Sequence, residues 1–125
     1  MTLSESTGQD YVIRVHAEPH TVDGAAWNAL LAQQASPTPF LRFEYLRALH
    51  ASASAVPATG WAPQWLTVES AGALQAATPL YLKSHSYGEY VFDWAWADAY
   101  QRHGLDYYPK LLCAVPFTPI TGPRL

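Results

Sequence analysis

The sequence predicts an α/β (α+β) fold, in which a mixed, mostly antiparallel sheet is combined with three helices in the order β-α-α-β-β-α-β. Three observations support this fold class. Residues 11–17 alternate between apolar and polar side chains, as a half-buried strand does. Three later segments place apolar residues at helical spacing behind a residue that can cap a helix. Two further strand-like segments flank a short turn at 70–72, which predicts a hairpin.

Composition sets the scale of the domain. Half of the 125 residues are hydrophobic and 14% are charged, which argues for a packed core and against general disorder. We expect residues 1–9 to form a disordered polar lead and residues 10–125 to form one domain, since a chain of this length suits a single core.

The first half of the chain predicts one strand and two helices. The strand covers 11–17 and ends before a proline. One helix runs over 23–34 behind the cap Asp23, and another runs over 38–51 behind the cap Thr38. A proline directly after Thr38 suits the first helical position, because its missing N–H is not needed there.

The second half predicts a hairpin, a long helix and a last strand. The hairpin pairs 61–69 with 73–83. The helix covers 87–103, where Ser86 and Glu89 fit the Ser-x-x-Glu capping box. The last strand, within 111–117, is nearly all apolar, which is typical of a central strand covered on both faces.

The helix predicted over 87–103 carries the first candidate site residues. Helical spacing places Glu89, Asp93 and Tyr100 on one stripe, which we assign to a substrate cleft. Carboxylates there would orient an amine, and aromatic rings would stack on a substrate. The alternative is that these residues only cap the helix and fill the core. A neighbouring apolar stripe is expected to pack on the domain's own sheet: Phe92, Trp96 and Ala99.

The last eleven residues carry the second group of candidates. Thr118, Thr121 and Arg124 follow the apolar strand and are candidates to line a pocket at its end, where loops often hold functional residues. The alternative is structural, because the prolines among them would stiffen a sheet edge and prevent wrong pairing. The sequence favours neither interpretation.

Several classes of function have no support in the sequence. The net charge is −3 and no basic stripe occurs, so we expect no nucleic-acid partner. The five histidines have no ligand spacing, which predicts no metal site. Neither a Gly-x-Ser-x-Gly elbow nor a phosphate-binding loop is present. Cys113 lies in an apolar run and is expected to be buried and inert.

Localisation is predicted from what the sequence lacks. The first residues have neither the charged nor the apolar region of a signal peptide. No apolar run approaches the roughly twenty residues that span a bilayer. A single cysteine forms no internal disulfide and suits a reducing compartment. Together these features predict a cytoplasmic protein without a membrane span.

Three long runs of the sequence resemble a known family: PFLRFEYLRALHAS (39–52), PLYLKSHSYGEYVFDWAWADAYQRHG (79–104) and YYPKLLCAVPFTPITGPRL (107–125). They are similar to the amino-terminal part of FemAB-like predicted N-acyltransferases of the GNAT superfamily, which are associated with peptidoglycan biosynthesis or recognition. The resemblance implies that residues 10–125 form the amino-terminal, GNAT-like half of a longer enzyme, apparently truncated. A helix as long as 87–103 between strands departs from a minimal GNAT domain.

The resemblance also implies a function and a set of partners. The fragment would shape the acceptor side of an acyl-transfer cleft, bind no cofactor itself and be inactive alone. The full-length N-acyltransferase would take acyl-CoA or aminoacyl-tRNA as donor. Expected partners are the missing carboxy-terminal half or another copy of the chain, and a cell-wall precursor. Two other functions stay open: a cell-wall glycan or peptide binding module without catalysis, and a purely structural half-domain.

Overall fold

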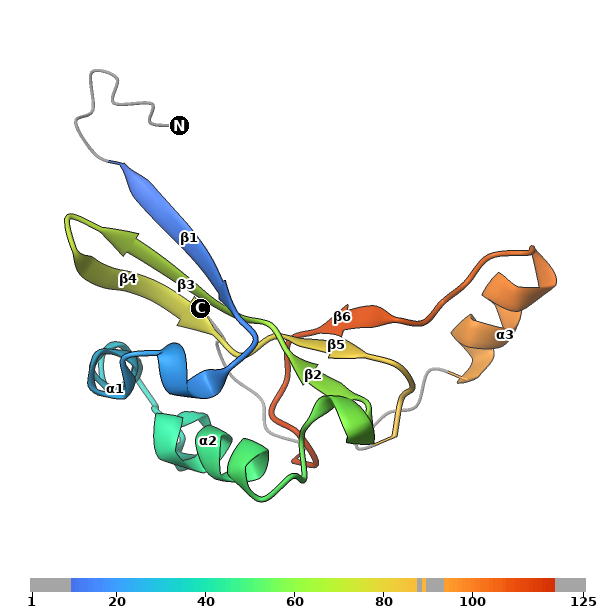
Figure 1. Ribbon diagram of the computed structural model, residues 1–125, viewed down its shortest axis with the longest axis horizontal. Helices are drawn as coiled ribbons and strands as arrows, with labels where there is room; N and C mark the ends of the chain where they lie inside the picture. The colour runs from blue at the N-terminus through green and yellow to red at the C-terminus, as the bar shows by residue number, and fades with distance from the viewer. Residues whose placement is uncertain (1–9, 88, 90–93, 119–125) are drawn as a thin grey trace.

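A computed structural model of the protein describes residues 10–87, 89 and 94–118, which form two three-stranded antiparallel sheets together with helices (Figure 1). The α-helices are α1 Gly24–Leu31, α2 Phe43–Ala51 and α3 Trp94–Arg102. The strands are β1 Tyr11–His16, β2 Trp61–Pro63, β3 Trp65–Ser70, β4 Ala73–Thr78, β5 Tyr81–Lys83 and β6 Lys110–Leu112. Short 3-10 turns lie at Pro19–Thr21, Pro39–Leu41 and Pro57–Thr59. The predicted α+β class is confirmed, and the GNAT-like part of that prediction stays a prediction.

The two sheets share one long, bent hairpin. Next to the turn of this hairpin β3 pairs with β4, and farther from the turn β2 pairs with β5. The break falls at Pro79, which has no N–H to donate to a strand ladder, and the Gln64 N–H donates across it to the Leu80 carbonyl at 2.7 Å. The predicted hairpin therefore exists, but each predicted strand is divided between two sheets. Ala71 and Gly72 turn the chain with positive φ angles of 54° and 78°, as a tight hairpin turn requires.

The two sheets add one outer strand each. β1 pairs with β3, which gives the order β1-β3-β4, and β6 pairs with β5, which gives the order β2-β5-β6. The expectation that the apolar run at 111–117 forms a central strand is wrong. Only β6 is a strand there, it lies at the end of its sheet, and the side chain of Leu111 is exposed.

Helix α1 begins where the sequence predicts. The Asp23 carboxylate accepts from the Ala26 N–H at 3.1 Å, which satisfies one of the unpaired donors of the first turn. The second predicted helix is divided. Thr38 caps only the 3-10 turn, Arg42 is extended, and α2 starts at Phe43. The reason is a partner on α1: the Phe43 N–H donates to the Asn28 side chain at 2.9 Å.

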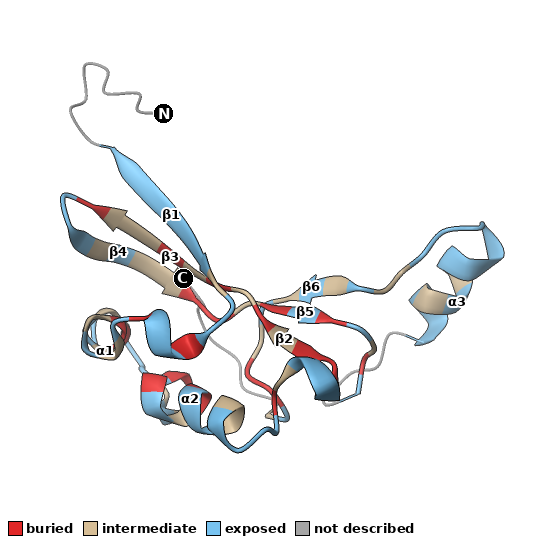
Figure 2. Ribbon diagram, in the orientation of Figure 1, coloured by how far each residue is buried: buried red, intermediate tan, exposed pale blue. Residues whose placement is uncertain are grey.

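The core lies where α1 and α2 cover the sheets (Figure 2). Aromatic rings dominate it: the Trp65 ring lies 5.3 Å from Trp27, 6.2 Å from Phe43 and 6.5 Å from Tyr81. The indole N–H of Trp27 donates to the Leu41 carbonyl at 2.9 Å, so this buried polar group is satisfied. Large rings from separate elements therefore fix how the helices sit on the sheets.

Helix α3 differs most from its prediction. It lies beyond the far ends of β5 and β6, away from α1 and α2 (Figure 1), and none of its residues is buried. Trp96, which was expected to pack on the sheet, is 65% exposed; Phe92 lies outside the described residues. Tyr87 and Glu89 lie in a turn and a bend instead of in a helix. The Ser86 hydroxyl is buried and has no hydrogen-bond partner among the described residues, Glu89 included, so the predicted capping box is wrong.

The prediction of a buried Cys113 is also wrong. The residue is exposed, because it follows the outer strand β6 rather than lying in a covered one. Its Sγ lies 3.0 Å from the Thr78 hydroxyl. No helix among the described residues combines the length and the apolar character that crossing a membrane requires.

Candidate functional site

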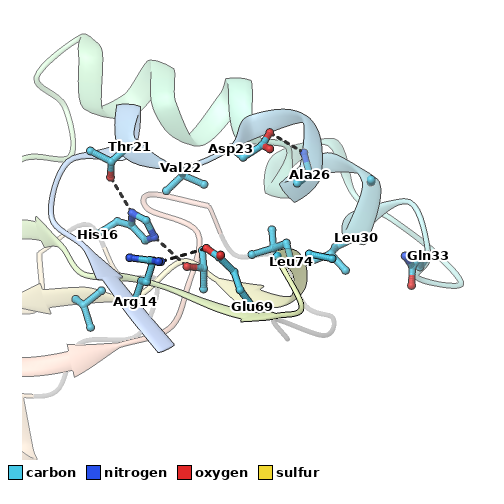
Figure 3. A pocket seen from close by; sticks show the side chains of 15 residues that line it. Arg14, His16, Thr21, Val22, Asp23, Ala26, Leu30, Gln33, Glu69 and Leu74 are labelled. Atoms are coloured by element: carbon cyan, nitrogen blue, oxygen red, sulfur yellow. Dashed lines mark hydrogen bonds and ion pairs between the residues drawn. The ribbon is translucent and has the colours of Figure 1, made fainter. Parts of the chain in front are cut away.

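A groove lies between α1 and the face of the sheet formed by β1, β3 and β4 (Figure 3). Its volume is about 980 Å³, at the upper end of the range for small-molecule sites. Val22, Leu30 and Leu74 contribute apolar side chains to its lining. Charged and polar side chains of β1 and β3 lie beside them, so the groove combines an apolar wall with groups that can orient a polar ligand.

Strand pairing brings the charged residues of the groove together. In the register of β1 and β3, Val12 is opposite Glu69 and Arg14 is opposite Thr67, so Arg14 and Glu69 are diagonal neighbours on one face. The Arg14 Nε lies 3.3 Å from a Glu69 carboxylate oxygen, and their side chains are 57% and 32% exposed. Both groups therefore keep contact with solvent and can also reach a ligand.

His16 is held in one orientation by two threonines. Its Nδ1 lies 2.7 Å from the Thr21 hydroxyl and its Nε2 lies 2.9 Å from the Thr67 hydroxyl. The Thr21 hydroxyl donates to the Glu18 carbonyl at 2.8 Å, so it accepts from His16. This assigns the proton of the neutral ring to Nδ1 and leaves Nε2 to accept from Thr67.

The electrostatic surroundings keep this ring neutral at pH 7. Burial lowers the pKa of His16 below its ordinary value of 6.5, the positive charge of Arg14 lowers it further, and the Glu69 carboxylate offsets part of the effect. A neutral imidazole can accept a proton. The groove thus contains a carboxylate, a guanidinium and a base, and the hydroxyl of Thr67, a residue that is 2% exposed, lies between the base and the groove.

The predicted site residue Glu89 lies in a different place, between two lysines. One carboxylate oxygen lies 2.8 Å from the Lys110 ammonium, and the other lies 3.8 Å from the Lys83 ammonium. The side chains of Lys83, Glu89 and Lys110 are 0%, 8% and 14% exposed. The Lys83 ammonium also lies 3.8 Å from the centre of the Trp61 ring. This cluster fixes the chain after β5 against β6, and a role of Glu89 in substrate binding stays a prediction.

Two other predicted site residues, Tyr100 and Thr118, lie among the described residues, and their role in binding stays a prediction. The Tyr100 ring stacks edge-on against Tyr107 with centroids 5.0 Å apart. The Thr118 hydroxyl lies 3.3 Å from the Tyr45 hydroxyl. Asp93, Thr121 and Arg124 lie outside the described residues.

Sequence reasoning did not single out the residues of the groove. The alternation of 11–17 already places Arg14 and His16 on one face of a strand. What the sequence does not give is the partner strand, because either strand of the hairpin could have paired with β1. Within the described residues, no three His, Cys, Asp or Glu side chains lie close enough together to hold a metal ion.

Comparison with known families decides the relationship of the chain. The model of the FemAB-like family, described as peptidoglycan biosynthesis/recognition, matches residues 18–125. The chain belongs to the FemAB-like family. No curated protein and no solved structure matches it significantly. The part of this FemAB-like chain that matches includes Thr21, Thr67 and Glu69 of the groove, whereas Arg14 and His16 precede it. Membership of the family indicates a role connected with peptidoglycan.

Proposed function

We propose that this FemAB-like chain forms the acceptor side of an acyl-transfer cleft, and that the groove beside α1 holds the amine that receives the acyl group. The observation that supports the proposal is the meeting of Glu69, Arg14 and a neutral His16 in one groove. An acceptor connected with peptidoglycan would be a peptide that carries both an amine and a carboxylate. Glu69 suits the ammonium form of the amine, and Arg14 suits the carboxylate.

The chemistry requires that the amine lose a proton. An alkyl amine has a pKa near 10 and is an ammonium at pH 7, which cannot attack a carbonyl. In the proposed step, the Thr67 oxygen accepts a proton from the ammonium while the Thr67 hydroxyl proton moves to Nε2 of His16, 2.9 Å away. The free amine then attacks the acyl carbonyl of an ester or thioester. The C–O or C–S bond breaks, and the alcohol or thiol leaves with the proton that the nitrogen loses as the amide forms.

The acyl donor has no assigned place on this chain. We propose that residues outside these 125 bind acyl-CoA or aminoacyl-tRNA, so that the chain alone binds the acceptor without turning it over. Its contribution to catalysis is then the orientation of the amine and the removal of its proton, which together supply a large part of the rate enhancement in such reactions.

Binding of a defined peptide by the chain alone tests the proposal. The probe is a short peptide with a free carboxylate and one lysine amine, titrated calorimetrically at pH 7. We expect Glu69→Gln to weaken binding about five-fold, which corresponds to about 1 kcal/mol for a part-exposed ion pair. Acetylation of the lysine amine should weaken it similarly, and Glu69→Gln should then have no further effect.

Asp98→Asn is the matched control. Asp98 also forms an exposed ion pair with an arginine, at 3.2 Å from Arg102 on α3, and α3 lies away from the groove (Figure 1). This variant should bind the peptide as the wild type does. Equal affinity of Glu69→Gln and the wild type, or equal affinity for the free and acetylated peptides, would contradict the assignment of the groove.

Exposed aromatic side chains support a second function, a cell-wall glycan binding module without catalysis. Trp94 and Trp96 on α3 are 61% and 65% exposed, and exposed indole rings stack well on the apolar faces of sugars. Binding of a soluble peptidoglycan glycan that is lost in Trp96→Ala and kept in Glu69→Gln would favour this second function.

A further inference from the structure

The outer edge of β1 has the character of an interaction surface. In the sheet order β1-β3-β4, β1 lies at the end (Figure 1), and no other strand among the described residues pairs with its second edge. All six residues of β1 pair with β3 in an unbroken register. The backbone groups of a straight edge strand form a regular template on which another strand can add.

Several side chains of β1 are both apolar and exposed. Val12, Ile13 and Val15 are 46%, 68% and 56% exposed, and Figure 2 shows most of the strand in the colour of exposed residues. Because side chains alternate along a strand, Ile13 and Val15 lie on the face opposite to that of Arg14 and His16. This face continues across the sheet through the partners of Ile13 and Val15, which are Val68 and Leu66.

The described residues of β1 itself lack the usual protection against pairing. Natural edge strands carry prolines, bulges or unpaired charges that disfavour association. β1 contains no proline, and its pairing with β3 has no bulge. Its one charged side chain, that of Arg14, is paired with Glu69 of the same chain. A charge that is already neutralised opposes an incoming strand less than a free one does.

We propose that β1 pairs antiparallel with β1 of a second copy of the chain, about a two-fold axis at Ile13, so that two three-stranded sheets become one of six strands. A second copy fits because the strand is complementary to itself. In such a pair Ile13 is opposite Ile13, and Val15 is opposite Tyr11, all on the exposed apolar face. Pairs of β-branched and aromatic side chains opposite each other stabilise a sheet.

Symmetry and charge select this register. Residues directly opposite each other in an antiparallel pair point to the same face of the sheet. A two-fold axis perpendicular to the sheet satisfies this only if one residue is opposite the same residue of the other copy. The axis therefore lies at the level of a residue and not between two residues. Only axes at Ile13 and Arg14 allow five residues of each β1 to pair. The axis at Arg14 would set two guanidinium groups directly opposite each other, which is unfavourable. The axis at Ile13 has no such conflict. The proposal does not depend on the function of the groove.

Disulfide trapping tests the register. Residues directly opposite in an antiparallel pair have Cα atoms about 4.5–5.5 Å apart, within the range for a disulfide. In a Cys113→Ser background, we expect Ile13→Cys to form a covalent dimer under mild oxidation. Val15→Cys is the matched control, because it lies on the same face with similar exposure but is about 13 Å from its symmetry mate, four residues of strand rise. It should form no covalent dimer.

Sedimentation equilibrium tests the association itself. The wild-type chain should show a reversible monomer–dimer equilibrium, and Ile13→Lys should shift it to monomer while circular dichroism shows unchanged folding. Equal cross-linking of Ile13→Cys and Val15→Cys would overturn the proposed register. A wild-type chain that stays monomeric up to its solubility limit would overturn the proposal and assign the edge to a different partner.

Discussion

Replacing Lys83 by methionine should remove a rise in stability that the wild-type protein shows above about pH 8. The Lys83 side chain is fully buried and lies 3.8 Å from the Glu89 carboxylate. Burial lowers the pKa of Lys83 to about 8; the Glu89 carboxylate opposes this effect, and the Lys110 charge adds to it. An unfolded lysine has a pKa of about 10.4. Between these two values the unfolded chain therefore binds a proton that the native protein has released.

The sign of the pH effect follows from this difference. Stability rises with pH wherever the unfolded state binds more protons than the native state. The contribution of Lys83 thus grows from about pH 8 and is complete near pH 10. Tyr81 acts in the opposite direction at higher pH, because burial raises the pKa of its phenol above 10.0 and the unfolded tyrosine ionises first. The rise that comes from Lys83 should therefore end near pH 10.

The magnitude follows from the two pKa values and from screening. The difference between them corresponds to about 3 kcal/mol. Solvent near Lys110 and Glu89 screens part of this, so we expect a measured rise of about 1–2 kcal/mol. At pH 7, methionine would fill the space beside Trp61 and leave Glu89 paired with Lys110. Lys83→Met should therefore match the wild type there or exceed it by about 1 kcal/mol.

These free energies of unfolding are measured by urea unfolding with tryptophan fluorescence as the readout. The measurement is repeated in half-unit steps from about pH 7 to about pH 10. Lys83→Met should give a flat profile below the range where tyrosines ionise. Leu82→Met is the matched control on the same strand, since Leu82 carries no charge and is 37% exposed; it should keep the rise. A rise of equal size in Lys83→Met and the wild type would refute the assignment to Lys83.

Two further substitutions test local packing by the same urea measurement. Gly24→Ala should lower stability by about 1–3 kcal/mol despite the better helix propensity of alanine, because the new Cβ would collide with the Phe43 ring; unchanged stability would show that this ring can move aside. Ser86→Ala should leave stability unchanged or raise it by up to about 1 kcal/mol, because the buried hydroxyl has no partner among the described residues. A loss of about 1 kcal/mol would instead indicate a capping role.

Local features of this fold were predicted from the sequence because neighbouring residues produce them. The Asp23 cap depends only on an N–H three residues ahead. The hairpin turn depends on the ability of Gly72 to adopt a positive φ angle. The strand at 11–17 depends on its own alternation. Family membership is equally a property of the sequence, and the match over residues 18–125 confirms it.

Features that depend on distant partners were predicted poorly. The helix expected over 38–51 is divided because Asn28, on another helix, accepts from the Phe43 N–H. The Ser-x-x-Glu pattern at Ser86 does not show whether the glutamate carboxylate accepts from a backbone N–H of its own turn or pairs with a distant side chain. Here Glu89 pairs with Lys110, which lies 21 residues away in the chain, since an ion pair with a buried lysine is stronger than an exposed cap.

The sequence by itself determined the class of fold, the start of α1, the hairpin and the family. Only the tertiary structure brought the residues of the groove together. Arg14 and Glu69 share a groove because β1 pairs with β3. A single sequence does not show which strands pair. The physical reason is that capping and turn formation are decided within a few residues, whereas strand pairing and charge burial depend on how the whole chain packs.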